Sequence, residues 1–295
     1  MRRFTLQTGR AIYDKDTAKE AGMEDSQYLS LNLDKGSVRI YDFGAVKLHA
    51  YRTRDPMDDE SFLLEKQGRA FVLEPPCFAD NIRELSRYIV GQSLAVDGVV
   101  AAYHMAGATF LPDTPRYSTK RAVEYGTEGH GKALVEGFAM AFGEDFDPSL
   151  PKASQCKHIR GSSLTLAGIK LKIIPTGDAF DVEIPEIGAA YVHMLGAASH
   201  SIIAGHAHGK QMVERLRGLR RQQYQLILSS HSEPETVDDA SVKIAYLRDV
   251  MDLAAVSRTA GDFMAAAKER YPNYAGENYL EMTASLLFPS PAPPC

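Results

Sequence analysis

The sequence predicts a single α/β domain built as a four-layer αββα sandwich, with two central sheets covered by helices on their outer faces. Two series of short alternating strands, each accompanied by helical segments and a buried strand, give the chain two similar halves. With 295 residues, 44% of them hydrophobic, the chain is long enough to bury such a core. We expect residues 1–288 to form this domain and the proline-rich residues 289–295 to be disordered.

The first half is predicted to begin with an antiparallel meander of about five strands between residues 27 and 74, where apolar and polar residues alternate. Apolar residues at helical spacing then predict a helix over 77–89. The apolar run over 96–103 is typical of a strand buried on both faces, and it ends directly on His104. Between 105 and 151 we expect one helix, at 131–142, and a segment that covers a site mouth without extending the sheet.

The second half repeats this theme, with strands predicted in the runs SLTLAG, IKLKIIP, DAFDVEIP and AAYVHML between residues 163 and 195. A helix is expected from His206, then a buried strand at 224–229, then helices over 238–287 with breaks near Arg258 and at 271–276. The sheets are expected to be lined by Val72, Val99, Val100, Ile173, Val192 and Ile227.

Composition excludes several kinds of partner. The net charge of -5 gives no basic excess for nucleic acid, and no apolar run approaches the roughly 18 residues of a membrane helix. Three widely spaced cysteines, Cys77, Cys156 and Cys295, favour neither a disulfide framework nor a cysteine zinc site, so a cytoplasmic protein is expected. The long helical tail and apolar stretches such as 251–256 favour a homodimer.

Four side chains with metal-binding chemistry follow predicted strands: His104, Asp178, His193 and His231. Because ligand sites assemble beyond the carboxyl ends of strands, these residues are candidates for one site. Imidazoles plus one carboxylate form a usual ligand set for a catalytic divalent ion with a position open to water. Each residue also has a structural interpretation, as a packed histidine or a turn aspartate, and His200 competes with His193 for the site role.

Other polar residues rank below these. His206 and His208 form an HxH pair, but they open a predicted surface helix, which favours a capping or solvated role. Tyr103 and Tyr125 are candidates for donating hydrogen bonds to a substrate oxygen, although packing is the commoner role of tyrosine.

The first half contains two segments that resemble the metallo-β-lactamase superfamily. The hairpin DDESFLLEKQGRAFVLEPP (58–76) is similar to the family's opening hairpin, with Glu74 in place of the usual aspartate. VVAAYHMAGATF (99–110) resembles the strand that runs into the HxHxDH metal loop, with His104 as the first histidine. The other three positions of that motif hold Ala106, Ala108 and Thr109, so this chain lacks ligands that the family has there.

The second half continues the resemblance in the same order, and together the matching segments extend over residues 61–289. The segment IIPTGDAFDVEIPEIGAAYVHMLG (173–196) resembles the family's third and fourth metal motifs. Asp178 takes the position of the third-motif histidine, and His193 takes the position of the aspartate that bridges the two metals in the family. LILSSHSEPE (226–235) is similar to the strand that presents the last histidine, His231. The DVEIPE and SSHSEP contexts look most like the alkylsulfatase-type branch.

This resemblance implies a metal-dependent hydrolase that acts on an ester-like bond of a small-molecule substrate. It implies one zinc ion, with His104 and Asp178 as catalytic residues and His104, Asp178, His193 and His231 as ligands. The replaced motif positions also favour an alternative, a metal-free and inactive member with a binding or structural role. Non-hydrolytic metal chemistry, such as a lyase or oxygen-handling reaction, is compatible with the same ligands.

Overall fold

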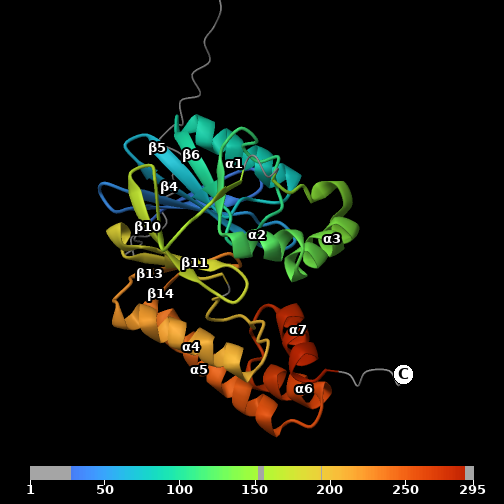
Figure 1. The fold of residues 1–295 in the computed structure, drawn as a ribbon. Coiled ribbons are helices and arrows are strands. Elements are labelled where there is room, and N and C mark those ends of the chain that lie inside the picture. The colour runs from blue at the N-terminus through green and yellow to red at the C-terminus, as the bar shows by residue number, and fades with distance from the viewer. Residues whose placement is uncertain (1–27, 152–155, 194, 290–295) are drawn as a thin grey trace, which may run out of the picture.

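Two sheets lie face to face at the centre of the computed structural model (Figure 1), which describes residues 28–151, 156–193 and 195–289. Side chains of both sheets interlock in one hydrophobic cluster, which includes Leu48 and Phe62 from the first sheet and Leu171, Ile173 and Val182 from the second. Burial of this apolar surface is what holds the two sheets together.

The first sheet has eight strands in sequence order. The expected meander forms its antiparallel part, and β5 to β8 are parallel neighbours. Its strands are β1 (Leu29–Asn32), β2 (Ser37–Asp42), β3 (Lys47–Arg52), β4 (Glu60–Lys66), β5 (Arg69–Leu73), β6 (Ala95–Val100), β7 (Arg116–Ser118) and β8 (Cys156–His158).

The second sheet has six strands in the order β14-β13-β12-β11-β10-β9. All its neighbours are antiparallel except β12 and β13, which run parallel because a helix connects them. Its strands are β9 (Ser163–Leu166), β10 (Ile169–Pro175), β11 (Phe180–Ile184), β12 (Ala189–Tyr191), β13 (Leu226–Ser229) and β14 (Ser232–Thr236).

Helices form the two outer layers. In the first half, α1 (Ala79–Gly91) packs on the outer face of the first sheet, with Ile82 and Leu85 against Val72 and Val99. The outer face of the second sheet is covered by α4 (His206–Arg221), α5 (Val237–Val256), α6 (Ala260–Arg270) and α7 (Glu277–Leu287). The predicted αββα arrangement is therefore confirmed.

The segment between β6 and β8 differs from its prediction. It contains the expected helix, α3 (His130–Phe142), but also α2 (Lys120–Thr127) and the short strand β7, which extends the first sheet. Strand β8 and the polar strand β14 were not predicted either. These strands have three to five residues, too few to show a period of two.

Five of the six residues expected to line the sheets are buried, whereas Val192 is half-buried against the C-terminal helices. Residues 1–27 and all of the expected tail except Pro289 lie outside the described residues. No described helix has both the length and the apolar character needed to cross a membrane.

Candidate metal centre

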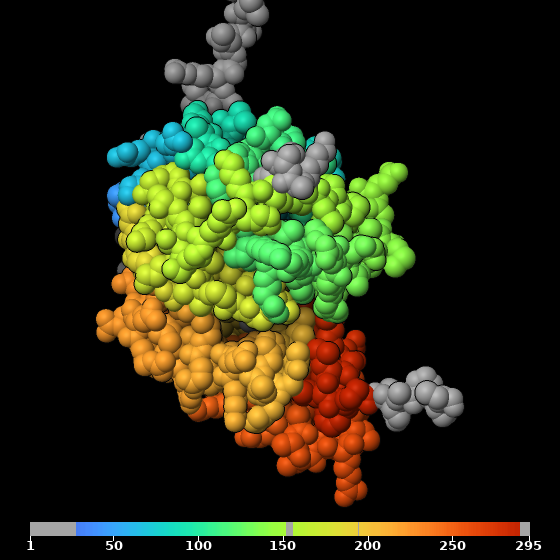
Figure 2. Space-filling view, viewed as in Figure 1, coloured from blue at the N-terminus to red at the C-terminus, as the bar shows by residue number. Residues whose placement is uncertain are grey.

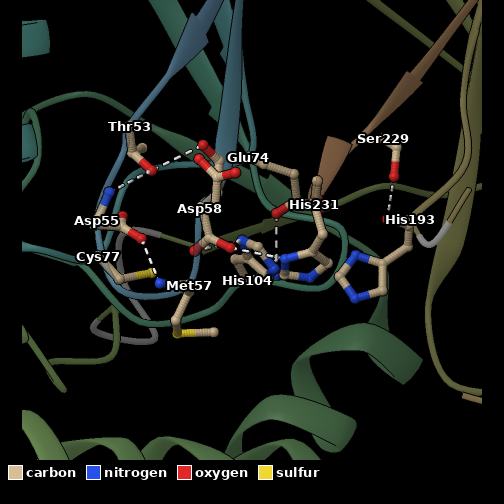
Figure 3. A network of polar contacts seen from close by, with 12 residues as sticks. Thr53, Asp55, Met57, Asp58, Glu74, Cys77, His104, His193, Ser229 and His231 are labelled. Atoms are coloured by element: carbon tan, nitrogen blue, oxygen red, sulfur yellow. Dashed lines mark hydrogen bonds and ion pairs between the residues drawn. The ribbon is translucent and has the colours of Figure 1, made fainter. Parts of the chain in front are cut away.

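Three histidines from three strand ends meet between the two sheets. His104 lies beyond β6 of the first sheet, and His193 and His231 lie beyond the parallel strands β12 and β13 of the second. Their ring centroids are 5.0 to 5.3 Å apart, and each offers a nitrogen within 4.8 Å of the others. Figure 3 shows the three rings gathered at one place. Such a cluster of imidazoles is a possible binding site for one divalent metal ion.

The surroundings of His193 favour its neutral imidazole, which is the form that binds a metal ion. Burial lowers the pKa of His193 well below its usual value, and repulsion from His231 and His104 adds to this effect. The side chains of His104 and His231 are only 13% and 9% exposed, so the cluster keeps a narrow opening to solvent. A largely desolvated set of imidazoles that face one another suits a cation better than it suits structural hydrogen bonding.

A buried carboxylate completes the cluster, and it belongs to Asp59. This residue directly precedes β4 and is 2% exposed, with its Oδ1 only 2.9 Å from Nδ1 of His231 and its Oδ2 4.0 Å from Nδ1 of His104. Burial acts to raise its pKa, but the imidazoles of His104 and His231 outweigh burial and hold the pKa of Asp59 below its usual value. Asp59 is therefore the negative charge next to the histidines.

The polar atoms here fit a metal ion. Asp59 Oδ1 and His231 Nδ1 are both buried, and neither makes an aligned hydrogen bond in spite of their 2.9 Å separation. Buried polar groups in folded proteins almost always have partners. The three imidazole nitrogens, with this carboxylate paired to one of them, are a donor set suited to a divalent cation.

Asp178, the carboxylate that the sequence suggested, does not belong to this cluster of described residues. The turn between β10 and β11 is closed by Thr176 and Ala179, and Arg121 bonds the carbonyl of Gly177. This turn places Asp178 in a separate pocket of about 350 Å³, together with Tyr125 and other residues of the α2–α3 region. Burial and the nearby Asp178 carboxylate raise the pKa of Tyr125.

Glu74 holds the loop that carries His104. Its carboxylate accepts hydrogen bonds from the backbone N–H groups of Tyr103 (2.9 Å) and His104 (3.0 Å) and from the hydroxyl of Tyr191 (2.8 Å). All of Glu74 is buried. Its acceptor capacity is used by the chain itself, which makes it a positioning residue for the His104 loop.

The loops that carry the other two histidines are fixed by serine side chains. Ser229 donates to the carbonyl of His193 (2.9 Å) and accepts from the N–H of Leu195 (3.0 Å). The backbone N–H of Ser230 also reaches the carbonyl of His193, at 3.1 Å. These bonds tie the end of β12 to the end of β13, so His193 and His231 keep their spacing.

Two tyrosines form walls beside the histidines. Tyr103 stacks on His193 with ring centroids 4.1 Å apart and an angle of 8°, and its hydroxyl bonds Thr176 at 2.7 Å. Tyr279 of α7 lies against His231, at 6.0 Å between centroids. The helix start at Gly276 has φ of 76°, and a Cβ there would lie 2.6 Å from the Tyr279 ring. Glycine therefore allows Tyr279 to fold back over the site.

The remaining histidine candidates have other roles. His200 is buried and its Nδ1 is 2.9 Å from the hydroxyl of Tyr246, so His193 and not His200 faces the cluster. His208 Nδ1 accepts from the N–H of Ala204, which precedes α4, and His206 is exposed. No side chain of the described residues caps the start of this helix, so of the two roles expected for the HxH pair the solvated one describes His206. Within the described ranges, neither His206 nor His208 joins a group of potential metal ligands.

Sequence reasoning missed Asp59 and Tyr279. The only signal for Asp59 was the run Asp58-Asp59-Glu60 before a buried strand, since three acids are more than a solvated turn requires. Nothing local marked Tyr279, which reaches the site only because α7 packs across the second sheet.

No model of a known protein family matches the sequence, and no curated protein matches it. Solved structures do resemble its fold. The inverting sec-alkylsulfatase Pisa1 from Pseudomonas superimposes with a TM-score of 0.58 at 13% identity over 84% of this chain and 49% of its own. A metallo-β-lactamase family protein from Thermus thermophilus gives 0.57 at 12% identity, over 82% and 91% of the two chains.

A metallo-β-lactamase from Erythrobacter litoralis, with β-mercaptoethanol in its active site, gives a TM-score of 0.52 at 14% identity over 75% of this chain and 99% of its own. The class of architecture is therefore clear: two mixed sheets between helical layers, with histidines at the strand ends. This chain has the metallo-β-lactamase fold, and it carries a possible His/Asp metal-binding cluster.

The view in Figure 2 shows how the outer layers meet at the surface. The C-terminal helices, orange to red, form one side of the molecule, and the surface is hollowed where α4 (gold) meets the yellow-green chain of the second half. The chain around α3 projects from the opposite half.

Proposed function

We propose that this protein is a metal-dependent hydrolase that cleaves an ester-like bond of a small molecule, using one zinc ion held by His104, His193 and His231. The observation that carries the proposal is the convergence of three imidazoles from three strand ends beside the buried carboxylate of Asp59. Three protein ligands with a small opening to solvent are the arrangement of catalytic zinc sites, whereas structural zinc sites have four.

A bound ion would supply Lewis-acid polarisation of the ester oxygen and activation of water. The chain itself contributes the rest. Asp59 offsets positive charge next to His231, and the stacked ring of Tyr103 fixes the orientation of His193. Because the hydroxyl of Tyr103 is engaged by Thr176, we assign it a wall role and not that of a hydrogen-bond donor. We assign Tyr125 and Asp178 to a neighbouring pocket that receives the distant part of the substrate.

A metal-free binding protein is the second candidate, and one observation favours it. Ala106 packs against Phe78 and Phe146, and Thr109 donates from its N–H and hydroxyl to Asp147. Two positions at which the family resemblance implies ligands are thus used for packing and loop structure. The three facing imidazoles weigh against this candidate, because a binding protein without metal has no need of them.

Metal analysis of untagged, zinc-supplied protein tests the proposal. We expect at least one zinc per chain in the wild type, and loss of the ion held by the three histidines in His104→Ala and in His231→Ala. His206→Ala is the matched control and should keep the metal, since His206 lies outside the cluster. Equal metal content in all four proteins, or none in the wild type, would support the binding-protein alternative.

Hydrolysis is tested separately with p-nitrophenyl carboxylate, sulfate and phosphate esters. We expect turnover of at least one ester class by the zinc-loaded protein, loss of turnover after chelation, and recovery when zinc is returned. Zinc binding without turnover of any of these esters would contradict the hydrolase assignment but not the metal centre.

A further inference from the structure

We propose that Asp59, Cys77 and His104 form a second cation position beside the histidine cluster, in which Cys77 is a thiolate ligand for a thiophilic divalent ion such as zinc, cobalt or cadmium. The inference goes beyond the one-ion site of the proposed function and shares His104 with it. It concerns binding and does not require that the protein be a hydrolase.

The geometry brings three different ligand types together. Asp59, Cys77 and His104 each offer one atom, and these atoms lie within 4.8 Å of one another. The Oδ2 atom of Asp59 is 4.0 Å from Nδ1 of His104. Figure 3 shows Cys77 on the far side of His104 from His193, so the second position lies next to the histidine cluster and not inside it.

The Cys77 thiol is buried in a place that gives it no strong partner. Cys77 is 5% exposed and precedes α1, within a small apolar cluster that contains Phe78, Ala106 and Phe146. Its hydrogen-bond contact is a weak one, from Sγ to the carbonyl of Pro75 at 3.8 Å. Packing alone accounts for a buried cysteine, but it does not account for a carboxylate and an imidazole beside the sulfur.

The Asp59 carboxylate is buried between this position and the histidine cluster. Its Oδ1 faces Nδ1 of His231 at 2.9 Å without an aligned hydrogen bond, whereas its Oδ2 is the oxygen next to His104. Its backbone is held because its carbonyl accepts from both the N–H and the hydroxyl of Thr53 at 2.9 and 2.8 Å. The 2% exposure of this residue means that water does not solvate its charge. A cation between Asp59 and Cys77 would satisfy that carboxylate.

The spacing of the two loops that carry the site is fixed by close packing. Gly107 has φ of 75°, and a Cβ there would lie 2.3 Å from the carbonyl oxygen of Pro76. Arg116 holds the same loop by donating to the carbonyls of Gly107 and Phe110. The loop after His104 therefore packs directly on the loop before Cys77. This contact fixes the separation between the side chains of His104 and Cys77.

The ligand chemistry selects the type of ion. Thiolate prefers soft and borderline cations, imidazole accepts the same ions, and magnesium and calcium prefer oxygen ligands. On binding, the Cys77 S–H bond breaks, its proton passes to solvent and the sulfur binds the cation. The charges of one thiolate and one carboxylate then balance a divalent ion.

The test is a cobalt titration of the full chain after chelator treatment, followed by absorption. A thiolate bound to cobalt gives an intense near-ultraviolet charge-transfer band, which nitrogen and oxygen ligands do not give. We expect this band in the wild type and its loss in Cys77→Ser, together with one fewer cobalt ion bound per chain. Cys156→Ser is the matched control, because Cys156 is half-exposed in β8, and it should keep the band.

The outcomes separate this inference from the proposed function. Visible cobalt bands without a thiolate band in the wild type, or a thiolate band that survives in Cys77→Ser, would overturn the second position and leave the histidine site standing. Absence of all cobalt bands would overturn both. An unchanged thermal midpoint of metal-free Cys77→Ser identifies loss of the band as loss of a ligand, and cadmium binding that is weakened at least about 10-fold in that variant gives a second readout that does not depend on cobalt.

Discussion

Histidines occupy two different kinds of surroundings in this molecule. Away from the metal centre, His49 and His200 are both buried, and each directs Nδ1 at a tyrosine hydroxyl: Tyr88 at 2.7 Å and Tyr246 at 2.9 Å. We regard these imidazoles as structural, because each ring has a phenol partner at Nδ1, and Nε2 of His49 lies 3.4 Å from the carboxylate of Glu65.

At the candidate metal centre, His104, His193 and His231 face one another, and their nearest charged neighbour is Asp59. His193 also has a tyrosine partner, with Nδ1 3.2 Å from the hydroxyl of Tyr191. The contrast teaches that burial alone does not separate a ligand from a structural histidine. What separates them is whether the imidazoles face one another: the three candidate ligands present nitrogens close to one another, whereas His49 and His200 each face a tyrosine hydroxyl. The predictions below test this distinction, beginning with the largest expected effect.

Replacing a facing histidine should affect metal binding far more than replacing a paired one. We expect His193→Ala to weaken zinc binding at least about 100-fold, because loss of a ligand exceeds the 10- to 100-fold cost of losing an outer partner. His200→Ala should leave zinc affinity within about threefold of the wild type. Competition with a chromogenic chelator measures both, and equal losses in the two variants would remove the distinction.

Glu74→Gln should destabilise the fold by about 2 kcal/mol, since an amide nitrogen cannot accept from the donors that now reach the carboxylate. Those donors are the N–H groups of Tyr103 and His104 and the hydroxyl of Tyr191. Urea denaturation of metal-free protein measures the loss. A variant as stable as the wild type would mean that Glu74 does not hold the His104 loop.

Lys243 lies near His200, and its titration gives a test of how stability depends on pH. It is fully buried and donates to the carbonyls of Gly196 (2.9 Å) and Ser199 (2.6 Å), and burial lowers its pKa to about 7, with Glu235 opposing the shift. Above pH 7 the unfolded chain, with an ordinary lysine pKa, holds a proton that the folded chain has lost. Stability should therefore rise with pH from about 7 to 10, by at most about 1.4 kcal/mol per pH unit from this group.

Lys243→Met should remove that contribution to the slope while leaving zinc binding unchanged. Urea denaturation at pH 7, 8 and 9 compares the two proteins. If the free energy of unfolding rises equally steeply with pH in both proteins, Lys243 has an ordinary pKa in the folded state and the assigned burial effect is wrong.

The smallest effect is expected for Tyr246→Phe, which removes only the hydroxyl next to His200. We expect a loss of about 1 kcal/mol in stability, the usual net contribution of one hydrogen bond. Zinc content should not change. A loss of zinc in this variant would show that the paired histidine communicates with the metal centre.

Much of the fold was predictable because most of its strands show alternation or a short apolar run. The runs that became β1 to β6 and β9 to β13 were recognised, and so were α1 and the three C-terminal helices. Strand β14, with the sequence SEPET, has no apolar alternation and contains proline, so it forms only because β13 offers a partner. The short strands β7 and β8 likewise depend on neighbours that are distant in the chain.

The candidate site was predictable only in part. His104, His193 and His231 follow strands whose apolar character is visible locally, and strand ends are where sites assemble. The carboxylate was assigned to Asp178 by its place in a motif, whereas the structure puts Asp59 beside the histidines. Asp59 arrives from the β3–β4 connection, and no local pattern indicates which acid of the run Asp58-Asp59-Glu60 faces the histidines; Glu60 is buried as well.

The position of the histidines between the two sheets has a further consequence for how the protein folds. Asp59 and His104 belong to the first half of the chain and His193 and His231 to the second, so an ion bound by them would cross-link segments that are separated in sequence by all of β7 to β12. The unfolded chain cannot present these ligands together. Free metal at 100 times its dissociation constant would then add about 2.7 kcal/mol to the free energy of unfolding. Metal supply would thus govern how long the chain survives proteolysis as well as whether it is active.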